Sequence, residues 1–294
     1  MRVYLTGAGG FIGGALKVHL ERAGHTVKAH SGRSDGQVSI PGDSEAVVNA
    51  AGRLVTGSSS HDEVEAANTV LPESMGRQCM ILGVPLIHLS TPGVCGLVAG
   101  GSEDDPHSPD GIYERSKSEG EKRLLALGLP QGGLTILRPD FVFGPADPHK
   151  LPLFRQVARG WFPVVGRDGP RTRPTHVRDV CRGVLAALPG GRLSGGVYNI
   201  GGPEVLTMGE VAGRAAAAMG RRVVVVSTPA PLLRLVLALG PLRPKALTPG
   251  RLRLFGTDRF VSLAKASTAG FTPCFSFDEA AADAVAWYRA EKLL

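Results

Sequence analysis

A glycine-rich turn near the start of the chain, TGAGGFIG at residues 6–13, constrains the fold more than any other sequence feature. It follows an apolar run typical of a β-strand, and helical spacing begins at Phe11. Bare backbone at this strand-to-helix turn comes from three glycines, Gly7, Gly10 and Gly13. A diphosphate must come close to bare backbone to bind, and the N-terminus of the following helix adds unpaired N–H groups and positive partial charge. The turn therefore predicts an α/β fold that binds a dinucleotide; the alternative is a plain tight turn.

The composition is that of a globular protein with a full hydrophobic core. Of 294 residues, 43% are hydrophobic and 20% charged, which suits one large domain or two joined ones. No leader is recognisable and no apolar run approaches the ~18 residues of a membrane span, so we expect a cytoplasmic protein without stable membrane insertion. The four cysteines lack metal-ligand spacing, which predicts free thiols and no metal site. The net charge of +7 is scattered, so we expect no nucleic-acid partner.

The loop after the second predicted strand, residues 26–29, indicates which dinucleotide is bound. An acid there holds the ribose 2′-hydroxyl, whereas Ser or Arg accommodates a 2′-phosphate. The loop offers Ser31 and Arg33, and no acid occurs before Asp35. We therefore predict NADP as cofactor, with NAD as the alternative if Arg33 is only a solvated loop residue.

A third buried-strand pattern, AVVNAAG at residues 46–52, follows sooner than a usual α/β unit allows. The third strand and its helix must therefore be abbreviated. Small residues at Ala50, Ala51 and Gly52 let a flat cofactor lie across the end of the strand, although close packing alone also explains them.

A tyrosine and a lysine share one face of a later helix. Tyr113 and Lys117 are spaced i, i+4, and an ammonium at that distance lowers the pKa of a phenol from its usual ~10. The preceding strand, residues 85–89, delivers Thr91 to the carboxyl end of the sheet, where its hydroxyl can polarise a carbonyl or alcohol oxygen. An exposed helix face with a chance pairing is the alternative.

These motifs in this order resemble the extended short-chain dehydrogenase/reductases, and more narrowly the NAD(P)-dependent epimerase/dehydratase family. They are TGAGGFIG (6–13), NAAG (49–52), HLSTPGVCG (88–96), YERSK (113–117) and RPDFVFGP (138–145). Similar segments continue at HVRDV (176–180), VYNIGGPEVLTMGEVA (197–212) and AGFTPCFSFDEAAADAVAWYR (269–289). The resemblance spans nearly the whole chain. It implies a Rossmann-type doubly wound parallel sheet with a smaller C-terminal α+β substrate lobe.

The resemblance also implies domains and residue roles. Residues 1–150 with about 174–202 would form the dinucleotide-binding domain, and 151–173 with 203–294 the substrate-binding lobe. Tyr113 would move the proton and Thr91 hold the oxygen, while Lys117 binds the nicotinamide ribose and lowers the tyrosine pKa. The remaining cofactor contacts would be Gly7, Gly10, Phe11, Ile12, Gly13, Ala50, Ala51, Gly52, Pro139 and Val142.

Two positions depart from the family pattern. Cys95 replaces the aromatic residue of a V-Y-G motif at the edge of the substrate site. Pro92 and Gly93 follow Thr91 in this chain. The resemblance implies that a dehydratase of the family would carry Asp-Glu at these positions instead. We therefore do not expect a dehydratase.

The second half of the chain bears on the substrate. In sugar-nucleotide members of the family an arginine near residues 166–177 faces the substrate phosphates. The candidate for this arginine is Arg173 or Arg171. The alternative is that these residues belong to a solvated basic loop. His176 is expected near the cofactor and is counted with the substrate-binding residues. The apolar segment 231–239 is interpreted as a lid, or else as an interfacial helix for a lipid-like substrate.

Together these features predict an NAD(P)-dependent oxidoreductase or epimerase that moves hydride between the nicotinamide and a carbonyl or secondary alcohol. The expected partner is a small molecule, a nucleotide-activated sugar undergoing 4-keto reduction or epimerisation. The alternatives are a reductase of a hydrophobic, steroid- or flavonol-like ketone or alcohol, and a non-catalytic NADP(H)-binding sensor. The oligomeric state stays open, a homodimer included.

Overall fold

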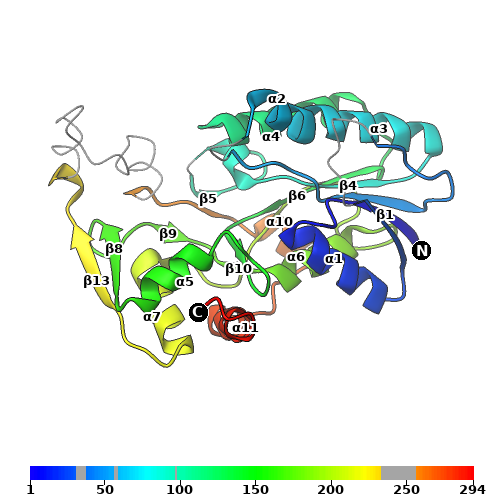
Figure 1. Ribbon diagram of the computed structural model, residues 1–294. Helices are drawn as coiled ribbons and strands as arrows, with labels where there is room; N and C mark the ends of the chain where they lie inside the picture. The colour runs from blue at the N-terminus through cyan, green and yellow to red at the C-terminus, as the bar shows by residue number, and fades with distance from the viewer. Residues whose placement is uncertain (31–37, 56–58, 97, 233–255) are drawn as a thin grey trace.

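A parallel sheet of six strands forms the centre of the structure, a computed structural model that describes residues 1–30, 38–55, 59–96, 98–232 and 256–294 (Figure 1). The strand order is β11-β6-β4-β3-β1-β2, and every neighbouring pair is parallel. This is the doubly wound α/β architecture that the sequence predicted. The six strands are β1 (Arg2–Thr6), β2 (Thr26–His30), β3 (Ala46–Asn49), β4 (Leu86–Leu89), β6 (Leu134–Pro139) and β11 (Gly196–Ile200).

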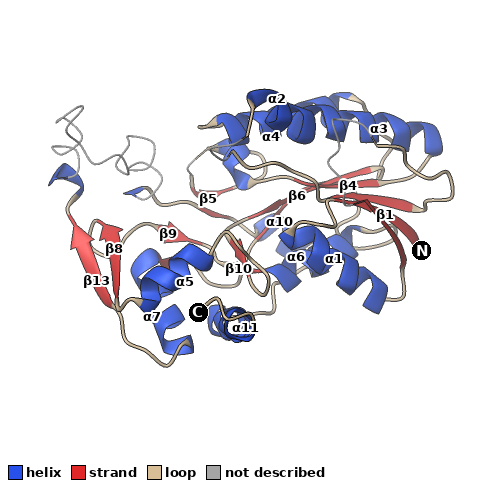
Figure 2. Ribbon diagram, in the orientation of Figure 1, coloured by secondary structure: helices blue, strands red, loops and turns tan. Residues whose placement is uncertain are grey.

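Helices cover both faces of this sheet (Figure 2). Successive side chains of β1 point to opposite faces of the sheet. Val3 and Leu5 belong to the hydrophobic cluster on one face, and Tyr4 belongs to the cluster on the other. The first face carries α1 (Phe11–Arg22), α6 (Val177–Ala187) and α10 (Ala264–Thr268). The second carries α2 (His61–Glu65), the π-helical turn η1 (Ala66–Val70), α3 (Leu71–Leu82) and α4 (Ile112–Ala126).

The direction of winding changes at β1. Strand β2 lies on one side of β1 and β3 on the other, so a crevice opens beyond their carboxyl ends, at the glycine turn. The described part of the connection between them, residues 38–45, holds neither helix nor strand, which agrees with the abbreviated unit expected there.

Two of the three glycines of the turn are required by packing and the third by access. Gly7 has a φ of +74°, and a Cβ on it would lie 2.5 Å from the Ala51 backbone nitrogen. A Cβ on Gly13 would overlap the Gly7 carbonyl oxygen. Gly10 is exposed instead, and its missing side chain keeps the start of α1 open.

A second group of elements packs beside the sheet around its own core. Helices α5 (Leu151–Ala158), α7 (Met208–Ala218) and α11 (Phe277–Ala290) enclose an aromatic-rich cluster that includes Phe154 and Tyr288. Its parallel two-stranded ribbon is β8 (Trp161–Val165) with β13 (Val224–Thr228). The shorter elements are η2 (Pro92–Cys95), β5 (Ala99–Gly101), β7 (Val142–Phe143), β9 (Arg171–Thr172), β10 (Thr175–His176), β12 (Leu206–Thr207) and β14 (Phe260–Val261).

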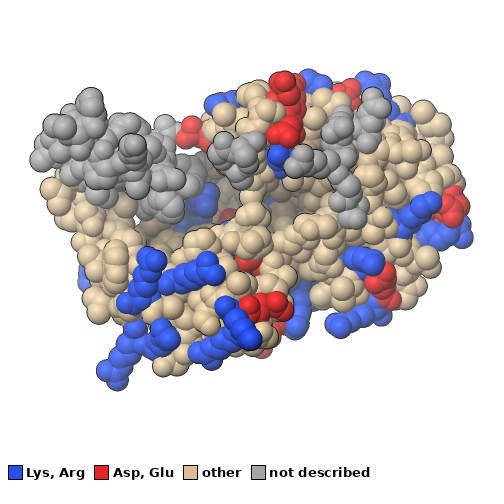
Figure 3. Space-filling model, in the orientation of Figure 1, with Lys and Arg blue, Asp and Glu red and all other residues tan. Residues whose placement is uncertain are grey.

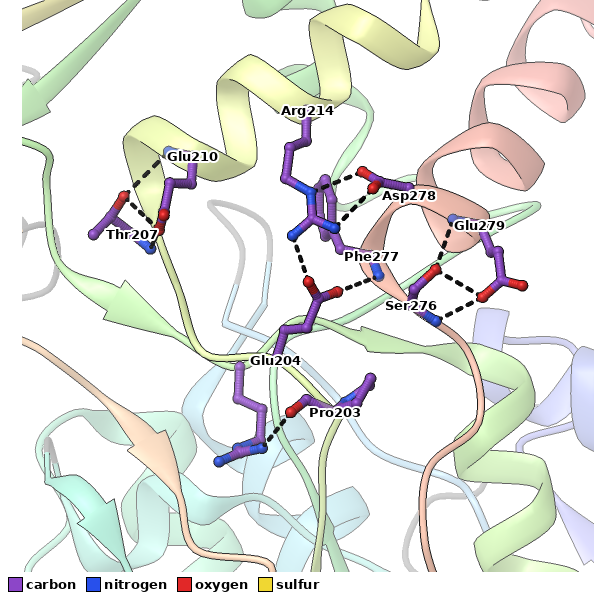
Figure 4. A network of polar contacts seen from close by, with 10 residues as sticks. Pro203, Glu204, Thr207, Glu210, Arg214, Ser276, Phe277, Asp278 and Glu279 are labelled. Atoms are coloured by element: carbon purple, nitrogen blue, oxygen red, sulfur yellow. Dashed lines mark hydrogen bonds and ion pairs between the residues drawn. The ribbon is translucent and has the colours of Figure 1, made fainter.

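A polar network holds α7 against the start of α11 (Figure 4). Arg214 donates two hydrogen bonds to Asp278, at 2.7 and 2.8 Å, and a third to Glu204 at 2.6 Å. The other oxygen of Glu204 accepts from the Phe277 backbone N–H at 2.8 Å. Charge-assisted, bidentate bonds of this kind fix geometry as well as adding energy.

Basic side chains gather over α5, α7 and α11 on the face shown in Figure 3. Three of the arginines donate to backbone carbonyls at or beyond the C-terminal end of another of these helices, where the helix dipole is negative. The pairs are Arg155 with Leu293 at 3.1 Å, Arg221 with Ala158 at 2.7 Å and Arg289 with Met219 at 2.7 Å. Positive charge here therefore helps to hold the three helices together.

The division into a dinucleotide-binding domain and a substrate-binding lobe stays a prediction; α5, α7 and α11 enclose a hydrophobic cluster apart from the two on the faces of the sheet. Helix α10 lies within the predicted lobe segment 203–294, yet its Ala266 packs into the sheet cluster. None of the described helices has the length and apolar character that crossing a membrane requires. The predicted apolar helix at 231–239 lies, from residue 233 on, outside the described residues.

Adjacent glycines of α1 give a matched test of this packing. Gly13→Ala forces a methyl group into the Gly7 carbonyl and should lower the free energy of unfolding by about 1–3 kcal/mol or more. Gly14→Ala places its Cβ at an ordinary 3.5 Å from the Ala8 oxygen and should be neutral or stabilising by up to about 1 kcal/mol. Denaturant unfolding of both variants checks this, and equal effects would contradict the packing argument.

Candidate active site

A cleft of about 610 Å³ opens at the carboxyl ends of the strands, where the sheet meets the second group of elements; Figure 3 shows the hollow. Its walls come from the β1–α1 turn, the end of β4, η2, the start of α4, the β6–β7 connection and β14. Segments far apart in the sequence thus meet in one cavity of the size usual for small-molecule sites.

The structure brings six of the predicted site residues together here. The predicted residues that line the cleft are Phe11, Ile12, Thr91, Tyr113, Pro139 and Val142. Lys117 and the glycine turn lie directly behind this wall. Ser31 and Arg33, the predicted determinants of the NADP preference, lie outside the described residues.

The turn at the head of α1 fits the diphosphate of a dinucleotide. No side chain caps this helix, so the N–H groups of its first turn remain available to an anion. Gly7 brings the turn against Ala50 and Ala51, and the neighbouring Gly52 is exposed. A Cβ on Gly52 would lie 3.1 Å from the Lys117 Nζ, so a side chain there would crowd the ammonium.

Lys117 is an almost fully buried cation. It is 3% exposed, and its Nζ donates a hydrogen bond to the Leu89 carbonyl at 3.0 Å. Burial lowers its pKa to about 8, and the nearby Glu121 carboxylate opposes that shift. At neutral pH Lys117 therefore remains charged beside the cleft.

Tyr113 and Thr91 present their hydroxyl groups to the cleft. Burial, together with the adjacent Glu114 carboxylate, raises the pKa of Tyr113 to about 12. Desolvation of the phenol thus dominates, and the lowering of this pKa that was expected from Lys117 is not seen. The Thr91 Oγ1 accepts a hydrogen bond from the Gly93 N–H at 3.3 Å, which leaves its own hydrogen to donate to a ligand.

A buried ionic layer lies beneath α4. Arg138, 2% exposed, donates to both oxygens of the fully buried Glu121 at 3.1 and 2.6 Å. The same guanidinium contacts the Cys95 sulfur at 3.4 Å and the His107 ring at 3.0 Å. Burial raises the pKa of the Cys95 thiol, and the nearby Arg138 guanidinium opposes that shift only in part. Cys95 lines the cleft as a thiol.

Several residues that line the cleft or lie behind it had no sequence prediction. Glu121 follows Lys117 by one helical turn, so its spacing was a usable signal. Lys150 and Arg259 also line the cleft, and only the fold brings their segments together. Between them lies Asp140, 8% exposed, whose pKa burial raises to about 6.

Arg173 and His176, the predicted substrate contacts, do not line the cleft. The Arg173 guanidinium donates to the carbonyls of Val261 and Gly202, both at 2.9 Å, and so braces the backbone. The His176 ring is 1% exposed and stacks against Phe275. Arg171 pairs with Asp258 at 2.7 Å. Among the described residues, no group of three or more His, Cys, Asp or Glu side chains is arranged to hold a metal ion.

The buried ammonium predicts a trade-off between stability and activity. Because the pKa of Lys117 falls from 10.5 to about 8, the unfolded chain binds this proton more tightly than the folded one, a cost of about 3 kcal/mol below pH 8. Lys117→Met removes this cost but also loses the hydrogen bond to the Leu89 carbonyl. The net effect should be a stabilisation of about 1–3 kcal/mol at pH 7. The gain should shrink as pH rises from 8 towards 10.5.

Denaturant unfolding at pH 7 and pH 10 measures this effect. Lys122→Met, an exposed lysine on the same helix, is the control and should show no comparable gain. A Lys117→Met protein less stable than wild type at pH 7 would refute the desolvation argument.

Comparison with known proteins identifies the family of the chain. The family model described as RmlD substrate binding domain matches residues 1–232. The dTDP-4-dehydrorhamnose reductase of Mycobacterium tuberculosis is 30% identical over 206 residues, covering 65% of this chain and 66% of the relative. The chain thus spans slightly less than two thirds of that protein. The 2-alkyl-3-oxoalkanoate reductase of Stenotrophomonas maltophilia is 27% identical over 254 residues, 75% and 76% of the two chains.

Solved structures confirm the fold. The UDP-glucuronic acid 4-epimerase from Bacillus cereus, solved in complex with NAD, superposes with a TM-score of 0.78 at 19% identity and covers 99% of each chain. The chain therefore belongs to the RmlD substrate binding domain family, within the extended short-chain dehydrogenase/reductases that its motifs predicted.

Proposed function

We propose that the protein is an NAD(P)-dependent oxidoreductase of the extended short-chain type that acts on a carbonyl or secondary alcohol of a nucleotide-activated sugar. One observation carries the proposal: the Thr91 and Tyr113 hydroxyls meet in a cleft that has the buried Lys117 ammonium and an uncapped glycine turn behind it. A nicotinamide dinucleotide bound at that turn would supply or accept the hydride.

The residues favour carbonyl reduction. With a pKa of about 12, Tyr113 is protonated at neutral pH and can donate to a carbonyl oxygen as negative charge develops there. Thr91 donates a second hydrogen bond to the same oxygen, because its lone pair is held by the Gly93 N–H. Lys117 provides a fixed positive charge behind both groups. Epimerisation requires the tyrosine in both protonation states, which the raised pKa opposes.

Two cations that line the cleft support an anionic substrate. They are Lys150 and Arg259, and burial lowers the pKa of Lys150 without a full counter-charge from Asp147. An anionic group would relieve this excess of positive charge, as the phosphates of a sugar nucleotide can. The names of the mycobacterial reductase and of the epimerase point to the same substrate class.

A reductase of a non-sugar keto compound is the second candidate. The Stenotrophomonas relative is named for a 2-alkyl-3-oxoalkanoate, a ketone with a carboxylate and alkyl chains. The same cleft offers apolar contacts from Leu54, Val98 and Phe260 beside its basic end. Both candidate substrates would place a carbonyl at Thr91 and Tyr113 for hydride transfer. They differ in the part of the molecule that lies away from this carbonyl. A non-catalytic sensor is the least supported alternative, since Tyr113 and Lys117 are both in place.

The preference for NADP over NAD remains a proposal that rests on Ser31 and Arg33. A cytoplasmic location is likewise proposed. A homodimer is a further proposal; exposed apolar side chains on α3 and α4, including Ile81 at 83% and Leu125 at 50%, are compatible with one.

Tyr113→Phe tests the proposed function. Wild-type protein is mixed with NADPH or NADH and with dTDP-4-dehydrorhamnose or a 2-alkyl-3-oxoalkanoate, and loss of reduced cofactor is followed. The variant should lose about 10²–10⁴-fold in kcat/KM but bind NADPH as before. Tyr198→Phe, which removes a hydroxyl bonded to the Gly195 carbonyl, should retain activity. Binding of NADPH without turnover of any probe by the wild type would favour the sensor.

A further inference from the structure

Glu114, the residue after Tyr113, turns its side chain into the cleft. It is the third residue of α4, a position from which glutamate usually caps its own helix. Three other glutamates of this chain do so: Glu63, Glu210 and Glu279 accept from their N-cap N–H groups at 3.0, 2.8 and 2.8 Å. Glu114 makes no such bond to Gly111.

Two glycines from different segments make room for this side chain. A Cβ on Gly93 would lie 2.7 Å from the Glu114 Cγ and 3.5 Å from the Thr91 Oγ1. A Cβ on Gly111 would overlap the Glu114 Oε2. The side chain is half-buried, and in the described part of the chain it has neither a hydrogen bond nor an ion pair. A carboxylate without a partner thus lies beside the hydroxyl that holds the substrate oxygen.

We propose that Glu114 is a third catalytic residue, which takes a proton from the carbon next to the carbonyl held by Thr91 and Tyr113 and returns it. This proposal rests on the proposed function and extends it to chemistry at the α-carbon. The sequence argued against such chemistry because Pro92 and Gly93 stand where dehydratases of the family carry acids. In the fold, α4 supplies a carboxylate to the bare face of that same Gly93.

The step balances without any redox partner. The α C–H bond breaks, its proton passes to the Glu114 carboxylate, and the electron pair delocalises onto the carbonyl oxygen. Hydrogen bonds from Thr91 and from the protonated Tyr113 stabilise the resulting enolate oxygen. Return of a proton to the carbon restores the ketone, and in D₂O that proton is replaced by deuterium.

The test follows deuterium incorporation into dTDP-4-dehydrorhamnose in D₂O. Protein saturated with NADP⁺ is used, so that no hydride donor is present, and mass spectrometry with NMR locates the label. Wild type should label the carbons flanking the keto group faster than the probe exchanges alone. Glu114→Gln should lower that rate about 10²-fold or more, and Glu114→Asp should recover part of it.

Two controls separate catalysis from folding. Glu119→Gln alters an exposed carboxylate of the same helix, paired with Arg123 at 3.0 Å, and should exchange like wild type. Gly93→Ala keeps Glu114 but crowds its side chain, so exchange should fall while thermal unfolding and NADPH binding stay close to wild type.

The outcomes distinguish this proposal from the one beneath it. If wild type reduces the probe with NADPH but does not exchange its α-protons, the role of Glu114 is wrong and the proposed function stands. Exchange that persists in a folded Glu114→Gln protein overturns the role in the same way. If wild type neither reduces nor exchanges this probe or a 2-alkyl-3-oxoalkanoate, the proposed function fails and this proposal falls with it.

Discussion

The burial of one positive charge, the Lys117 ammonium, shapes the surroundings of the cleft. A single carbonyl, that of Leu89, solvates it directly, so the nearest opposite charge must come from Glu121 one turn later. Glu121 is itself fully buried and requires the bidentate Arg138. The remaining N–H groups of Arg138 donate hydrogen bonds to the Cys95 sulfur, the His107 ring and the Glu103 carbonyl. Glu121, Arg138 and their hydrogen-bond partners thus form one connected network beneath α4, which offsets the cost of burying the Lys117 charge beside the cleft.

The sequence predicted the parts of this arrangement that are local. The glycine turn and the Tyr113–Lys117 spacing each depend on a few consecutive residues, so the strand, turn and helix were recognisable directly. The doubly wound parallel sheet and the family were confirmed as well. The shift of the Tyr113 pKa was predicted with the wrong sign, because spacing shows the nearby cation but not the loss of water around the phenol.

The substrate end of the cleft could not be predicted in the same way. Lys150 and Arg259 are more than a hundred residues apart and meet because the chain returns to the cleft just before β14, which pairs with β5 in a small sheet of its own. Arg173 was chosen from a basic run, yet its guanidinium is consumed by the backbone carbonyls that hold this returning segment. Composition identified arginines in the right region, whereas which of them faces the ligand depends on tertiary contacts.

The two ends of the cleft therefore differ in how they treat charge. Near Lys117 the buried charges of Glu121 and Arg138 pair with each other. This leaves the Thr91 and Tyr113 hydroxyls and the Glu114 carboxylate to face the cleft. Asp140 and Asp147 lie near Lys150 and Arg259. Burial raises the pKa of both carboxyl groups, that of Asp140 to about 6, so positive charge there remains partly unmatched. A substrate with a carbonyl at one end and an anionic group at the other complements both conditions at once. Such a substrate would be oriented before any chemistry begins, because reversing it would bury its charge beside Leu89 and expose the unmatched cations.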